Sequence, residues 1–155
     1  SIYVPVQRKL AGFRDAATRA GVDPGDIDER IAESMFTLEG GAAGTRRLLA
    51  VGVTGIVAAS DMMALGAISA ARDSGARVPD DVSVIGYDDT DLMRFTDPPL
   101  TTVRQPVERI AEHIATELLA QIGGRTAEPT EALFPGELIA RSSTARCGTV
   151  VPVGR

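Results

Sequence analysis

The feature of this sequence that most limits its fold is an alternation of helix-type hydrophobic patterns with short apolar runs of strand type. Two runs stand out, at 55–59 and 82–87, each bounded by turn residues. Helical patterns surround them at 7–20, 38–51, 61–74 and 106–122. This alternation predicts an α/β fold in which helices cover both faces of a parallel sheet.

Weaker runs at 31–35, 100–103, 132–134 and 137–141 are further strand predictions, and the polar segment 88–99 predicts a loop with one helical turn. Ser60 is the predicted N-cap of the helix at 61–74, and Gly75 is expected to end that helix. Ligands of parallel sheets bind outside the carboxyl ends of the strands. That rule directs attention to Ser60, Tyr87, Asp88 and Asp89, which stand at or just after strand ends.

Charge and composition exclude several classes of protein. The net charge is −5 and no basic stripe is present, which argues against direct nucleic-acid binding by these residues. The single cysteine, Cys147, cannot form an internal disulfide and fits a reducing compartment. The first residues lack the pattern of a signal peptide and no apolar run reaches the length of a membrane span, so a cytoplasmic protein is expected.

The motifs of common enzyme classes are missing as well. The sequence contains no Gly-x-Ser-x-Gly elbow, no P-loop and no dinucleotide glycine fingerprint. His113 is the only histidine and has no companion at metal-ligand spacing, so a surface helix position is expected for it. We therefore expect no catalytic residues, no metal and no cofactor, and an enzyme of doubly wound fold remains a rival interpretation.

Three segments carry a resemblance to a known family: AASDMMALGAI at 58–68, VPDDVSVIGYDD at 78–89 and PPLTTVRQP at 98–106. Their order and spacing resemble the effector-binding domain of LacI/GalR-type transcription regulators. Weaker similarity extends to 9–13 and 36–40, and the match covers about 7–142. The resemblance implies a type I periplasmic-binding-protein-like fold that senses a sugar or similar small polar effector between two lobes. A transport-type sugar-binding protein of the same fold is the alternative.

The resemblance also predicts how the chain is divided. Residues 1–105 correspond to the second lobe, 106–136 to elements that belong to the first lobe, and 137–155 to a return strand and tail. The helix-turn-helix head, the hinge and most of the first lobe are not among these residues, so operator DNA would be contacted only through a separate head. Elements that lack their partners should leave apolar surface exposed.

Asp88 and Gln105 are the first two candidate ligand residues. A carboxylate at a strand end can accept two hydrogen bonds from adjacent sugar hydroxyls, and the resemblance places an effector contact at Asp88. Gln105 stands at the predicted crossover between lobes, where its amide can donate and accept. The alternatives are a carboxylate that caps the turn at 89–90 and a surface glutamine before Pro106.

Four further candidates follow from the resemblance. Lys9 occupies a position where the family usually has Arg, and Arg8 precedes it; lysine cannot reproduce the bidentate guanidinium fork, and both residues have the alternative of solvated charges. Phe36 matches an aromatic that stacks on sugar rings, with a core position as the alternative. Ser60 is first an N-cap, with effector contact as an addition.

The helix at 61–74 is apolar around most of its circumference. One side is expected to pack on the sheet, and the resemblance implies a homodimer contact on another. The candidate interface residues are Met62, Leu65, Gly66 and Ile68. Burial inside a monomer is the alternative.

Overall fold

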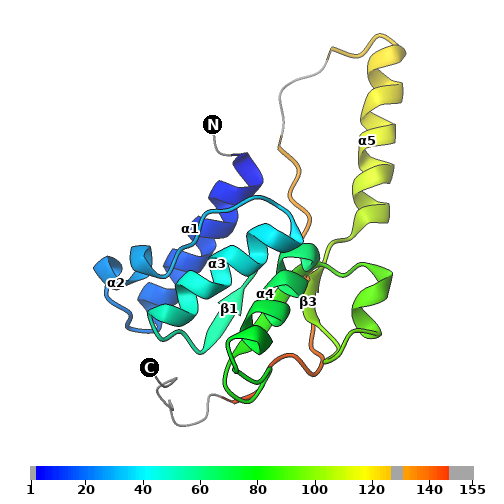
Figure 1. Ribbon diagram of the computed structural model, residues 1–155. Coiled ribbons are helices and arrows are strands. Elements are labelled where there is room, and N and C mark those ends of the chain that lie inside the picture. Colours follow the sequence, from blue (N-terminus) through cyan, green and yellow to red (C-terminus); the bar gives the residue numbers. More distant parts are fainter. Residues whose placement is uncertain (1–2, 127–130, 147–155) are drawn as a thin grey trace.

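The computed structural model describes residues 3–126 and 131–146 (Figure 1). In chain order its elements are α1 (Val4–Arg19), α2 (Pro24–Glu29), α3 (Leu38–Ala50), β1 (Gly55–Val57), α4 (Asp61–Asp73), β2 (Ser83–Asp88), a 3-10 helix (Asp91–Arg94), β3 (Thr101–Arg104), α5 (Val107–Ile122) and β4 (Glu137–Ile139). None of the helices in these ranges is long and apolar enough to cross a membrane.

The four strands form one sheet in the order β1-β2-β3-β4. The first three strands are parallel, and β4 runs antiparallel to β3. This arrangement confirms the predicted α/β fold class and the strand predictions at 55–59, 82–87, 100–103 and 137–141. The single helical turn predicted within 88–99 is the 3-10 helix.

Two strand predictions are wrong. Residues 31–35 and 132–134 lie outside the sheet, because a strand requires a neighbour for its N–H and C=O groups and neither segment has one within 3–126 and 131–146. Among the described strands, β1 is hydrogen-bonded to β2 alone. The second segment instead runs beside α5, where the Phe134 ring lies 5.5 Å from His113 in an edge-to-face arrangement.

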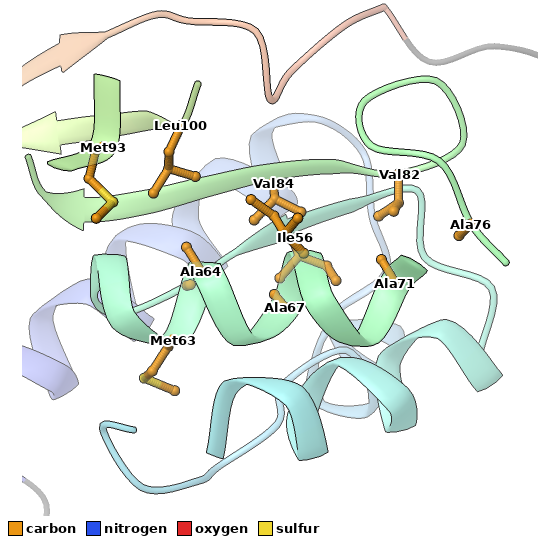
Figure 2. Packing of buried hydrophobic residues seen from close by; sticks show 12 residues of the cluster. Ile56, Met63, Ala64, Ala67, Ala71, Ala76, Val82, Val84, Met93 and Leu100 are labelled. Atoms are coloured by element: carbon orange, nitrogen blue, oxygen red, sulfur yellow. The ribbon is translucent and has the colours of Figure 1, made fainter. Parts of the chain in front are cut away.

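The core lies between α4 and the face of the sheet that carries Ile56 and Val84 (Figure 2). Its buried members are mostly small or aliphatic: Ile56, Ala58, Met63, Ala64, Ala67, Ile68, Ala71, Ala76, Val82, Val84, Met93 and Leu100. Small residues allow helices to approach closely, and α3 packs against α4 backbone to backbone. A Cβ built on Gly66 would lie 1.9 Å from the Leu38 carbonyl oxygen, and one on Gly41 would lie 2.1 Å from that of Met63.

The expected exposure of apolar surface is found on several elements, among them β1 and α5. Val57 on β1 is 64% exposed, although it belongs to the sheet. Helix α5 projects away from the sheet and has no buried residue (Figure 1). Its exposed hydrophobic side chains are Val107, Ile114, Leu118, Leu119 and Ile122.

Candidate ligand site at the carboxyl edge of the sheet

Two of the predicted ligand residues meet at the end of β2 and β3. Asp88 is the last residue of β2 and is paired in register with Arg104, the last residue of β3. Gln105 follows directly, and its Nε2 donates a hydrogen bond of 2.6 Å to Asp88 Oδ1. The parallel register therefore places an amide and a carboxylate side by side at the edge where ligands of such sheets bind.

The backbone at Asp88 is strained. Asp88 has a φ of 116° and Asp89 a φ of 55°, and each such non-glycine residue costs on the order of 1–3 kcal/mol. The N–H of Thr90 donates to Asp61 Oδ2 at 2.8 Å. Because the Thr90 N–H is bonded to Asp61, the alternative in which the Asp88 carboxylate caps the turn at 89–90 gains no support.

Lys9 reaches the same edge from α1. Its Nζ donates to the carbonyl oxygen of Ala59 at 3.0 Å and lies 3.5 Å from the centroid of the Tyr87 ring, a cation–π contact. Burial lowers the pKa of Lys9, and the charge of Asp88 raises it by less, so the net shift is downward. The Lys9 ammonium therefore lies near both Tyr87 and Asp88 at the end of β2. Arg8, by contrast, forms an exposed ion pair with Glu131.

The remaining candidates lie in different environments. Ser60 is buried, and its side-chain oxygen accepts a hydrogen bond of 3.3 Å from the N–H of Met63, which confirms the predicted N-cap. Phe36 is 50% exposed and precedes α3, so it is not a core residue. On α4, Met62 is exposed and Leu65 is partly buried, whereas Gly66 and Ile68 pack inside the chain.

Sequence reasoning did not find the environment of Asp89, whose side chain is 3% exposed. Arg104 Nε donates to its Oδ2 at 2.7 Å, and Arg141 Nη2 lies 2.7 Å from Oδ1 as an ion pair that is not aligned as a hydrogen bond. Burial is the largest single influence and raises the pKa of Asp89, but the two arginines together outweigh it and lower the pKa. A cavity of about 270 Å³ adjoins, lined by Asp89, Thr90, Asp91, Arg94, Arg104 and Arg141.

The set of groups at this edge suits a polyhydroxylated ligand. Sugar hydroxyls both donate and accept hydrogen bonds, and their C–H faces pack on aromatic rings. The Asp88 carboxylate accepts, the Lys9 ammonium donates, and the Gln105 amide does both, with Tyr87 as the aromatic surface beside them. No charged nucleophile or metal cluster is needed for such recognition, which rests on hydrogen bonding and packing.

Comparison with known proteins agrees with this geometry. A family model described as a periplasmic-binding-protein-like domain matches residues 4–144. The HTH-type transcriptional regulator MalR of Streptomyces coelicolor is 48% identical over 145 residues, which cover 92% of this chain and 42% of MalR. The chain thus spans about two fifths of the length of this curated relative.

Solved structures show the same similarity. The complex of the transcriptional regulator CelR with cellobiose has a TM-score of 0.78 and 39% identity, covering 86% of this chain and 41% of that chain. A lac repressor dimer bound to operator and an anti-inducer has a TM-score of 0.77 and 34% identity, covering 91% and 48%.

Proposed function

Because this chain belongs to the periplasmic-binding-protein-like domain family, in the form found in LacI-type regulators, we propose that it is the effector-sensing part of a DNA-binding transcription regulator. The proposed effector is a sugar or a similar small polar metabolite. The observation that carries the proposal is the contact between Asp88 and Gln105, with Lys9 and Tyr87 beside it at the carboxyl edge of the sheet.

The position of Gln105 supplies the link from binding to regulation. Gln105 lies between β3 and α5, and α5 projects from the sheet with its apolar side chains exposed (Figure 1). An effector that bonds to both Asp88 and Gln105 stabilises one orientation of α5 relative to the sheet. Such a bias regulates only if the effector has different affinities for the two orientations. In this proposal residues 1–105 form the second lobe, 106–136 are elements of the first lobe, and 137–155 are a return strand and tail.

The regulator is favoured over a transport-type sugar-binding protein because the relatives named above are transcriptional regulators. Their names likewise favour ligand sensing over catalysis and a cytoplasmic location. Operator DNA is contacted by a head outside these residues. For the proposed homodimer, Met62 and Leu65 remain available on α4, whereas Gly66 and Ile68 are covered by the chain itself.

The test is calorimetric titration of the full-length protein that carries this chain with cellobiose, ribose and other sugars. For the tightest sugar, Asp88→Asn should weaken binding roughly 10- to 100-fold, since a hydrogen bond to a charged group is lost. Asp91→Asn is the matched control, because the Asp91 side chain is 95% exposed and paired with Arg94. Equal affinities of Asp88→Asn and wild-type protein would show that Asp88 is not a ligand residue. If no sugar binds the wild-type protein, the proposal of a sugar sensor is refuted.

A further inference from the structure

Asp61, the first residue of α4, has a buried carboxylate with partners on two neighbouring elements. Its exposed fraction is 1%. Oδ2 accepts from the Thr90 N–H at 2.8 Å and from the Thr90 hydroxyl at 3.3 Å. Oδ1 accepts from the Thr102 hydroxyl at 2.6 Å. One carboxylate therefore joins α4, the middle of β3 and the turn that follows β2.

The absence of a side chain at Gly86 leaves space for the Asp61 carboxylate against β2. A Cβ added at Gly86 would lie 2.5 Å from Asp61 Oδ1 and 3.3 Å from the Thr102 hydroxyl oxygen. Only glycine at this position leaves room for the Asp61–Thr102 hydrogen bond directly over the strand. Gly86 lies two residues before Asp88 on the same strand.

The turn that Asp61 holds is the strained one. Asp88 and Asp89 both have positive φ, and such conformations persist only where the surroundings enforce them. Thr90, which donates two hydrogen bonds to Asp61, directly follows this strained pair in the chain. They fix the chain on the far side of the strained pair, while the pairing of β2 with β3 fixes it on the near side.

We propose that Asp61 is a positioning residue for effector recognition: by binding Thr90 and Thr102 it holds the turn at 88–90 in the conformation that keeps the Asp88 carboxylate beside Gln105. The inference rests on the proposed function, because it gives Asp61 a role in the same ligand site. Asp61 acts through Asp88 and does not itself touch the effector.

A double-mutant cycle distinguishes positioning from a general loss of structure. In the full-length protein, Asp61→Asn should weaken binding of the tightest sugar from the same panel about tenfold, and in the Asp88→Asn background it should have almost no further effect. A merely structural residue would weaken binding by the same factor in both backgrounds, and that result would overturn the inference. Asp73→Asn, at the exposed end of the same helix, is the matched control.

Hydrogen exchange supplies a readout that needs no ligand. Asp61→Asn should accelerate exchange of the Thr90 amide about tenfold, with little change in the centre of α4. Thr102→Val, which removes one donor and keeps the shape, should act in the same direction if Asp61→Asn does not fold. If no sugar binds the wild-type protein, the proposed function fails, and unchanged exchange at 88–90 in both variants separately overturns the role of Asp61.

Discussion

The closest approach of two helices makes Gly66→Ala the most informative stability variant. Gly66 on α4 faces the backbone of α3, where its added Cβ would lie 1.9 Å from the Leu38 carbonyl oxygen and 3.0 Å from the Ala42 nitrogen. Ordinary contacts of a Cβ begin near 3.4 Å, so the helices must separate by about 1.5 Å at this point. The atoms in the way belong to backbone and cannot rotate aside.

The magnitude follows from two opposing effects. Overpacking of a core costs about 1–3 kcal/mol, and the upper value applies here because backbone must move. Alanine is a better helix former than glycine by about 1 kcal/mol, which offsets part of that cost. We therefore expect Gly66→Ala to lower the free energy of unfolding by about 2 kcal/mol.

Gly12→Ala is the matched control. Gly12 lies within α1, and a Cβ there meets no atom within 4 Å. The same substitution should therefore raise the free energy of unfolding by up to about 1 kcal/mol. Urea denaturation followed by far-UV circular dichroism, at two protein concentrations, measures both changes apart from assembly. Equal stabilities of the two variants would contradict the close packing of α3 on α4.

Two further predictions concern turns and caps. Arg77 donates to Asp81 and lowers the pKa of Asp81 to about 2 from 3.8. The stability that this pair contributes is therefore present above about pH 3.8 and is lost as pH falls towards 2. Asp81→Asn should remove that part of the pH dependence of the urea midpoint, and an unchanged pH dependence in the variant would disprove the prediction. Ser60→Ala should lower the free energy of unfolding by about 1 kcal/mol while Ser60→Asn keeps most of it, as measured by thermal unfolding; equal losses would refute the cap.

Local patterns sufficed wherever structure depends on neighbours in sequence. The Ser60 cap and strand β2 follow from a few adjacent residues, and the parallel-sheet rule then places Asp88 at the ligand-binding edge. Gln105 follows instead from the resemblance and its predicted crossover, and the structure joins it to Asp88. The strand prediction at 31–35 is wrong because a short local pattern carries no information about whether a neighbouring strand exists. The apolar circumference of α4 predicts that it is covered on more than one side, but it does not tell which surface approaches Gly66.

Contacts between residues far apart in the sequence cannot be predicted from local patterns, because such patterns carry no information about tertiary neighbours. Asp89 meets Arg141 only because β4 pairs with β3 in one register, which no motif in either segment encodes. The contacts of Asp61 with Thr90 and Thr102 likewise depend on how α4 is seated over β2 and β3. A carboxylate at position 61 is favourable at any helix N-terminus, so the local pattern does not reveal its distant partners.

The two ion pairs of Asp89 tie together three segments at the carboxyl edge of the sheet. Arg104 belongs to the strand that leads out to α5, and Arg141 follows the strand that returns from it. Sliding β3 along β2, or β4 along β3, would separate an arginine from a carboxylate that is almost fully shielded from water, a costly change. The ends of β3 and β4 are therefore held to the turn after β2 by charge as well as by backbone pairing, at the base of the helix that projects from the sheet.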